Sequence, residues 1–224
     1  MKQLIKSATA VAVGAVLSLT AVDALAHKEG DFILRVGAAQ VSPNDDSSNV
    51  LGANDGVTVD SATGLGFSGT WMLSDNWGLE VLAALPFTHD INGSGDLAGL
   101  PIGETKQLPP TVSFQYYPEL GSDDFSPYFG LGVNYTKFFD EKASGELKTA
   151  LGTDDVQLEL DDSFGLAGQV GADWKISDDF YFNTAVWYVD IDTEAAVKVD
   201  GVTATTVDVQ IDPWVVMVGF AWRF

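Results

Sequence analysis

Histidine and cysteine, the side chains that most often carry nucleophilic or acid–base chemistry, are nearly absent from this sequence. It holds two histidines, His27 and His89, and no cysteine. His89 stands between Thr88 and Asp90, but adjacency in the chain does not place a nucleophile against a base and its orienting partner. No G-x-x-x-x-G-K-[ST] phosphate-binding motif occurs. The sequence therefore predicts neither an enzyme nor a cofactor-binding protein, and we place His89 in a loop.

Carboxylates are the most abundant charged groups. The chain has 32 Asp and Glu against 11 Lys and Arg, a net charge of −21, which excludes binding to nucleic acid through neutralised phosphates. Many of the carboxylates gather in a few segments, among them Asp45, Asp46, Asp140, Glu141, Asp154, Asp155, Asp161, Asp162 and Asp200. A divalent cation would bridge such oxygens to lipopolysaccharide phosphates, but no segment has the spacing of a calcium loop. We predict solvated acidic loops and no metal site.

The segments that position these residues follow an export signal. Lys2 and Lys6 precede an apolar run, which ends in an A-x-A cleavage site at Ala24-Leu25-Ala26. A membrane anchor is the alternative, but the run falls short of the roughly 20 apolar residues that a spanning helix needs. We expect residues 1–26 to be a cleaved signal peptide and residues 27–224 to form one domain.

The C-terminal segment has the pattern of a membrane-spanning strand. Between Trp214 and Phe224 every second residue is large and apolar, and the intervening residues are small or mixed. Alternation over about 11 residues matches a strand that crosses a bilayer. A strand of a soluble sandwich also alternates, but it is shorter and carries polar residues opposite its apolar face. By resemblance to outer-membrane barrels, the terminal Phe224 would be recognised by the barrel insertion machinery.

Seven further segments repeat the period of two and are separated by turn residues. They carry outward-facing residues from Phe32, Leu65, Trp77, Val112, Phe129, Phe164 and Phe180 onward. In lipid only a closed barrel satisfies all backbone hydrogen bonds of a set of strands. The predicted fold is all-β, an eight-stranded antiparallel transmembrane β-barrel.

Connection lengths orient this barrel. The connections at 74–76, 118–124 and 177–179 are short, and those near 41–57, 88–105, 139–156 and 193–207 are long. Short turns face the periplasm and long loops face the exterior. Four tryptophans, Trp71, Trp77, Trp174 and Trp222, fall near the short turns, where an aromatic girdle would lie.

The residues between the lipid-facing ones would line the lumen. Its periplasmic end receives a polar floor of both charge signs, namely Arg35, Glu80, Asp173, Lys175 and Arg223. Above it comes a constriction at Leu82 and Trp187 and an apolar stretch formed by Val189, Ile191, Val215 and Met217. Eight strands enclose just enough room for their own side chains or for one small ligand. Leu82 and Trp187 are therefore either a channel constriction or the packing of a filled interior.

Four prolines lie at or near strand positions in the extracellular half, at Pro86, Pro109, Pro110 and Pro213. Each removes one donor from the hydrogen-bonded ladder. They mark either the ends of strands or weak places in the wall. In the second case a solute stopped by the polar floor would leave sideways into the bilayer.

Several long stretches resemble the OmpW family of outer-membrane proteins in the same order along the chain. They are "HKEGDFILRVGAAQVSP", "LPPTVSFQYYP", "PYFGLGVNYTKFFD", "GQVGADWKISDDFYFNTAVWYVDIDT" and "IDPWVVMVGFAWRF". The resemblance fades in the first and third long loops. It implies an eight-stranded barrel in the outer membrane with a narrow apolar channel for small hydrophobic molecules, and no enzymatic activity.

Three functions remain open at this stage. The first is a passive channel for small hydrophobic compounds, in contact with outer-membrane lipid and lipopolysaccharide. The second is a structural, adhesive or receptor barrel with a closed interior, whose acidic loops contact other surfaces. The third is a soluble periplasmic sandwich, which osmotic shock would release.

Overall fold

Eight antiparallel strands close into a barrel. The computed structural model describes residues 27–49 and 55–224, so the predicted signal peptide lies outside the described residues. The barrel strands are β1 (Phe32–Ser42), β4 (Ala62–Met72), β5 (Trp77–Ala84), β8 (Thr111–Tyr116), β9 (Phe125–Ala143), β11 (Ser163–Ser177), β12 (Phe180–Val189) and β15 (Trp214–Arg223). They follow one another in the order β11-β12-β15-β1-β4-β5-β8-β9, and pairing of β9 with β11 closes the cylinder. The predicted fold is confirmed.

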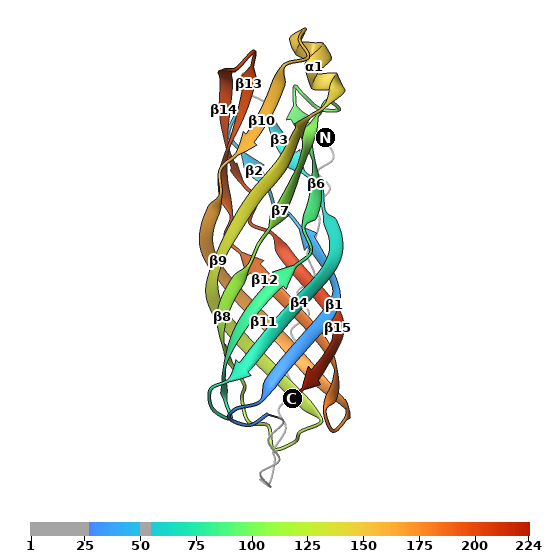
Figure 1. Cartoon of the computed structure of the whole chain (residues 1–224), viewed down its shortest axis with the longest axis vertical. Coiled ribbons are helices and arrows are strands. Elements are labelled where there is room, and N and C mark those ends of the chain that lie inside the picture. The colour runs from blue at the N-terminus through green and yellow to red at the C-terminus, as the bar shows by residue number, and fades with distance from the viewer. Residues whose placement is uncertain (1–26, 50–54) are drawn as a thin grey trace, which may run out of the picture.

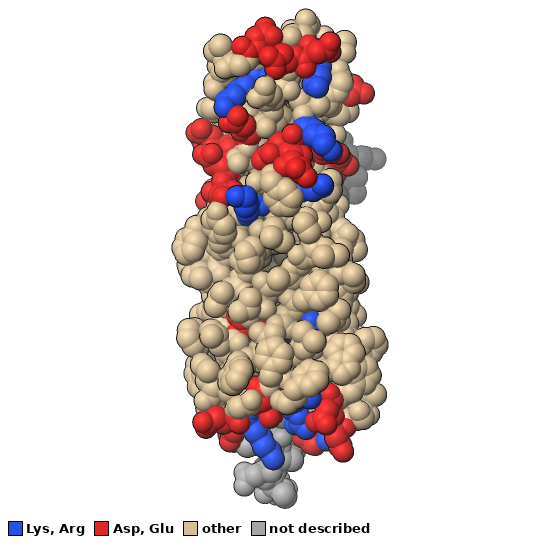
Figure 2. All heavy atoms as spheres, in the orientation of Figure 1, with Lys and Arg blue, Asp and Glu red and all other residues tan. Residues whose placement is uncertain are grey.

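Alternation of side chains gives the barrel two different faces. The outward positions carry the apolar set expected from the sequence, with Leu131, Phe164 and Leu166 each about 70% exposed or more. Figure 2 shows the result, a broad belt almost free of charged residues with Asp, Glu, Lys and Arg gathered at both ends. Such a large exposed apolar surface requires an apolar environment around it.

Short turns and tryptophans share one end of the barrel. Strands β4 and β5 are joined across Ser74, whose carbonyl accepts from Trp77 N at 3.4 Å. Trp71, Trp77, Trp174 and Trp222 are all exposed near this end. At the opposite end Tyr188 and Trp214 contact each other in a tilted arrangement, with ring centroids 5.1 Å apart. Aromatic residues therefore lie at both edges of the apolar belt, as in a protein that spans a bilayer.

The long extracellular loops continue the barrel strands. They contain seven further strands, β2 (Asp46–Ser47), β3 (Asp55–Val59), β6 (Phe87–Gly95), β7 (Pro101–Leu108), β10 (Val156–Leu160), β13 (Asp192–Val199) and β14 (Val202–Gln210). Figure 1 shows these strands stacked above the barrel, with the helix α1 (Gly145–Leu151) at the far end. His89, which we expected in a loop, lies in β6 and is buried.

This extension consists of two sheets. One has the order β3-β6-β7 and joins the upper part of β9, and the other has the order β10-β13-β14-β2. Breaks of two or three residues separate each extension strand from its barrel strand, and β9 alone among the described strands runs through both regions. The breaks contain Pro86, Pro109, Pro110 and Pro213, because proline cannot donate to a ladder.

The helix α1 joins the two sheets at the top. Its first turn is capped by Ser144, whose Oγ accepts from Leu147 N at 2.9 Å, and it ends at Gly152 in the left-handed conformation. Leu147 is buried against the extension strands. None of the helices in the described part of the chain has the length and apolar character needed to cross a membrane.

Candidate binding site in the lumen

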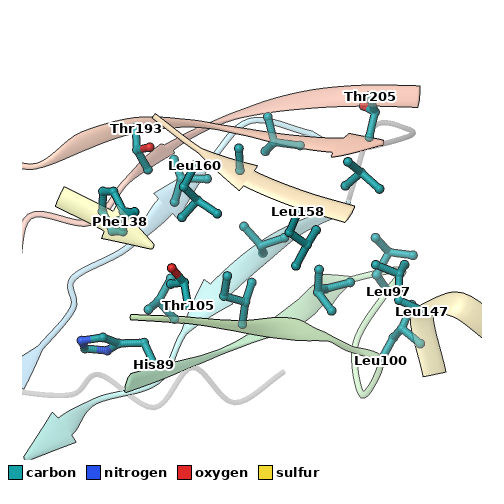
Figure 3. Close-up of a pocket in the computed structure, with 18 of the residues that line it drawn as sticks. His89, Leu97, Leu100, Thr105, Phe138, Leu147, Leu158, Leu160, Thr193 and Thr205 are labelled. Carbon is teal, nitrogen blue, oxygen red and sulfur yellow. The ribbon is translucent and has the colours of Figure 1, made fainter. Parts of the chain in front are cut away.

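The extension encloses an apolar cavity of about 260 Å³. Its walls come from both sheets and from α1, and they are mainly aliphatic: Val57, Ile91, Leu100, Ile102, Leu147, Leu158, Leu160, Val197 and Val207. Figure 3 shows Leu158 and Leu160 of β10 opposite Leu100 and Thr105, with Leu147 at one end. We call this space the upper cavity. An apolar cavity of about 150 Å³ already holds benzene in another protein, so the upper cavity has room for a small hydrophobic molecule.

His89 lies in the wall of the upper cavity and is fully bonded. Its Nδ1 lies 2.7 Å from the carbonyl oxygen of Asp60, and its Nε2 lies 2.9 Å from the Nε2 of Gln107. Because the Gln107 amide nitrogen donates, the ring keeps its proton on Nδ1 and stays neutral. Burial lowers the pKa of His89 below its ordinary value, which the carbonyl of Asp60 and the charges of Asp90 and Asp60 partly offset. Both ring nitrogens are already hydrogen-bonded, so His89 forms part of the cavity wall.

A second, smaller cavity of about 30 Å³ lies in the lumen between the upper cavity and the membrane half of the barrel. Its wall contains all six residues that the sequence placed in the constriction and the apolar stretch: Leu82, Trp187, Val189, Ile191, Val215 and Met217. Gln107 lines both cavities. We call the second space the lower cavity, and it would hold only one or two water-sized groups.

Below the lower cavity a polar network fills the lumen. Arg35 forms a two-point contact with Asp173, with Nη2 to Oδ2 at 2.6 Å and Nε to Oδ1 at 3.2 Å. Its Nη1 donates to Thr70 Oγ1 at 2.8 Å and lies 4.0 Å from Glu80. Arg35, Glu80 and Asp173 are fully buried. Buried charges persist only when paired and hydrogen-bonded, and we call this network the plug.

Uncharged side chains complete the plug. Tyr117 donates to Gln115 at 2.7 Å, Gln115 donates to Gln169 at 3.0 Å, and Asn183 donates to Asp173 at 2.8 Å. The ring of Tyr128 lies under Arg35, 4.6 Å from its guanidinium carbon. Sequence analysis missed Gln115 and Gln169, although both stand on the inward side of predicted strands. A search for polar residues at inward positions would have found them.

Two residues of the predicted floor lie apart from the plug. Lys175 bonds to Asp123 at 2.6 Å and Arg223 bonds to Asp179 at 3.0 Å, both at the periplasmic end. Their side chains are about one-fifth exposed. Lys175 lies nearer the periplasmic end than the plug because it follows Asp173 by two residues and is next to the turn after β11. His27 takes the place beneath the plug, with Nε2 3.7 Å from Asp173 Oδ2.

One seam of the wall has a stretch without ladder pairs. The last pair between β5 and β8 is Leu82 with Thr111, and the first pair between β6 and β7 is Phe87 with Gln107. There are therefore no ladder pairs between residues 83–86 and the opposite residues 108–110. Ala83, Ala84 and Pro109 line the lower cavity from this seam. Asn134 braces its edge, since Nδ2 lies 3.3 Å from the carbonyl oxygens of both Pro109 and Pro110.

Pro213 lies in a different seam. Its carbonyl accepts from Val189 N at 3.2 Å, and Ile211 N donates to the Ile191 carbonyl at 2.9 Å. The strands around Pro213 thus stay bonded on both sides of the break. Of the four prolines considered as a lateral opening, three lie at the unpaired stretch, namely Pro86, Pro109 and Pro110, and Pro213 does not.

Three carboxylates approach one another at the extracellular edge of the barrel. Asp190, Asp192 and Asp212 place oxygen atoms within 4.8 Å of one another. Asp212 accepts from Ile191 N at 3.1 Å and from Tyr188 at 3.2 Å. Two of the three are exposed, and exposed carboxylates of this kind are commonly solvated.

Comparison with known proteins places this geometry in a family. The model of the OmpW family matches residues 28–224. The chain belongs to the OmpW family. It is 46% identical over 209 residues to outer membrane protein W of Vibrio cholerae, covering 92% of this chain and 94% of that protein. It is 43% identical to outer membrane protein W of Escherichia coli strain K12, covering 96% and 98%.

Solved structures agree. The crystal structure of the outer membrane protein OprG from Pseudomonas aeruginosa superposes with a TM-score of 0.82 at 45% identity, covering 88% of this chain and 97% of that one. These relatives are outer-membrane barrels and not enzymes. The chain is accordingly an outer-membrane protein in contact with membrane lipid.

Proposed function

We propose that the protein is a channel for passive uptake of small hydrophobic molecules, with lateral release into the bilayer. The upper cavity carries this proposal, because an apolar space of about 260 Å³ lies directly above the constriction at Leu82 and Trp187. A cavity lined by aliphatic side chains binds apolar solutes by removing their surface from water. No energy source is required for such diffusion.

The plug favours a sideways exit. An apolar solute that moved on toward the periplasm would have to separate Arg35 from Asp173 and leave a buried charge unpaired, which is costly. The unpaired stretch between residues 83–86 and 108–110 offers a route with fewer hydrogen bonds to break. Ala83, Ala84 and Pro109 border both this stretch and the lower cavity. We therefore expect solutes to leave at Pro86, Pro109 and Pro110, and not at Pro213.

The name of one distant relative supports the class of solute. The Pseudomonas aeruginosa protein named dibenzothiophene metabolism operon protein PahQ is 28% identical to this chain over 129 residues. Dibenzothiophene is an apolar aromatic compound, so that name agrees with a hydrophobic solute.

Uptake by cells tests the channel. We expect cells that lack the protein, and cells with Trp187→Arg or Leu82→Asp, to lose uptake of an apolar substrate. Thr203→Asp is the matched control, since it adds a charge at an exposed extension position. Equal uptake in all strains would reject the channel and favour the alternative, a structural, adhesive or receptor barrel with a closed interior.

Restoring ladder donors tests the exit. We expect the double substitution Pro86→Ala and Pro109→Ala to slow uptake severalfold, because the new N–H groups let the seam pair. Pro110 is left in place, since its carbonyl accepts from Tyr135 N and its own nitrogen therefore faces β9. Pro213→Ala is the control and should leave uptake unchanged. If Pro213→Ala alone slowed uptake, the exit would lie elsewhere.

We also propose a cleaved signal peptide, recognition of Phe224 by the insertion machinery and contact of the extracellular end with lipopolysaccharide. Cleavage after Ala26 would leave His27 as the first residue of the mature chain, and N-terminal sequencing of the purified protein tests it. Phe224 is 72% exposed at the chain end, which suits recognition by the insertion machinery. Acidic residues at the extracellular end suit cation-bridged contact with lipopolysaccharide. Deletion of Phe224 should reduce the amount of protein that reaches the outer membrane.

A further inference from the structure

Trp187 carries a buried hydrogen-bond donor without an acceptor. The side chain is fully buried and lines the lower cavity, and its Nε1 has no hydrogen-bond partner among the described residues. An indole can donate one hydrogen bond and accept none. Native proteins leave few buried donors unpaired, so each exception calls for an explanation.

Gln169 separates Trp187 from the polar groups of the plug. Trp187 of β12 stands opposite Gln169 of β11 in the ladder, and Gln169 Nε2 donates to Glu80 Oε1 at 3.4 Å. The second oxygen of Glu80, Oε2, has no hydrogen-bond partner, and neither has Oγ of Ser113 across the next ladder. Of these residues Trp187 lines the lower cavity, and Gln169, Glu80 and Ser113 do not, so a solute in the cavity reaches the unpaired donor of Trp187.

The space above this boundary offers no comparable groups. The upper cavity is lined mainly by aliphatic side chains, and the two nitrogens of His89 are already bonded. In the lower cavity Asn134 donates to Thr111 at 2.9 Å and accepts from Thr136 at 2.7 Å. A solute would meet its first unpaired donor at Trp187. The lower cavity is narrow, which admits a slender end of a molecule while its apolar body remains above.

We propose that Trp187 Nε1 is a specificity-determining donor that selects apolar solutes with a terminal hydroxyl group. The hydroxyl oxygen of such a solute accepts the hydrogen bond from Trp187 Nε1 in the lower cavity. A hydroxyl oxygen can accept this bond, whereas a methyl group cannot. This inference rests on the proposed channel and adds an orientation to it: the solute descends with its hydroxyl end first.

Two solutes of equal length make the test. 1-Hexanol and heptane both have seven heavy atoms and differ by a hydroxyl in place of a methyl group. In native protein reconstituted in lipid nanodiscs, we expect 1-hexanol to move the indole N–H resonance of Trp187 downfield and heptane to leave it in place. The resonance is assigned by its loss in Trp187→Phe. No shift with 1-hexanol, or an equal shift with both solutes, would overturn the proposal.

Transport provides the second readout. In vesicles containing Trp187→Phe we expect the uptake of 1-hexanol relative to heptane to fall about fivefold, the size of one lost hydrogen bond. Trp71→Phe is the matched control, since Trp71 lies on the lipid face, and it should keep the native ratio. An unchanged ratio in Trp187→Phe would reject the role of Trp187 alone. If neither solute entered through the native protein, the channel itself would be rejected. Should Trp187→Phe fail to fold, the indole resonance is assigned in the native protein through its correlation with the backbone, and its response to the two solutes decides.

Discussion

The two halves of this protein use the same alternating strands with opposite polarity. In the barrel the outward residues are apolar and the inward ones at the level of the plug are polar, as at Phe164 and Asp173 of β11. In the extension the inward residues are apolar and the outward ones are charged or polar, as at Val207 and Asp208 of β14. The polarity of the outward face inverts at the breaks between barrel and extension strands.

The difference follows the solvent outside. The barrel lies in hydrocarbon, so its outer face must be apolar, and its lumen can hold the charges of the plug. The extension lies in water, so it buries apolar residues inward like a soluble protein. As a result an apolar cavity lies above a polar plug in one continuous lumen. The environment outside each half therefore determines which residues point into its interior.

The largest expected effect is on the plug. Arg35→Met removes the cation from between Asp173 and Glu80 and leaves buried carboxylates unpaired. We expect a loss of roughly 3–5 kcal/mol in the free energy of unfolding, measured by urea denaturation in lipid vesicles. Lys142→Met is the control, since it breaks an exposed ion pair with Glu104, and it should change the midpoint little. Equal midpoints for the two variants would show that the ion pairs of the plug do not stabilise the fold.

The next effect concerns the cavity. Ala195 lines the upper cavity, and its neighbour Ala196 does not. We expect Ala195→Phe to fill part of the space and to reduce uptake severalfold, more for larger solutes than for smaller ones, with little loss of stability. Ala196→Phe places the same ring on the opposite face of β13 and should leave uptake unchanged. Uptake that fell equally in both variants would contradict a role for the cavity.

The smallest effect is the pH dependence of the extension. Burial lowers the pKa of His89, so the unfolded chain takes up the proton at a higher pH than the folded one. The free energy of unfolding should therefore fall as the pH drops through the ordinary value near 6.5 toward the lowered one. We expect His89→Gln to weaken this dependence, measured as the urea midpoint between pH 7 and pH 5. An identical slope in the variant would exclude His89 as its source.

Much of the barrel could be predicted because its signal is local. The period of two from Trp214 to Phe224 fixed which residues meet lipid, and the short turn at 74–76 fixed the orientation. The inward sets containing Leu82 and Trp187, and Arg35 and Asp173, followed from the same alternation. In the extension the same period was present, at Val207, Val209 and Ile211. It went unrecognised as strand because the polarity was inverted and the breaks interrupted it.

The sequence by itself determined the number of barrel strands, the lipid face, the outer-membrane class of the protein and the polarity of the lumen at each level. Only the tertiary structure decided which inward residues meet: that Arg35 reaches Asp173 across the barrel, that Lys175 and Arg223 stay at the rim, and that His89 is buried. It also decided that Pro86, Pro109 and Pro110 share one seam. The physical reason is that alternation specifies the side of a strand, whereas contacts across the lumen depend on the stagger of the ladders, which is fixed only when the sheet closes.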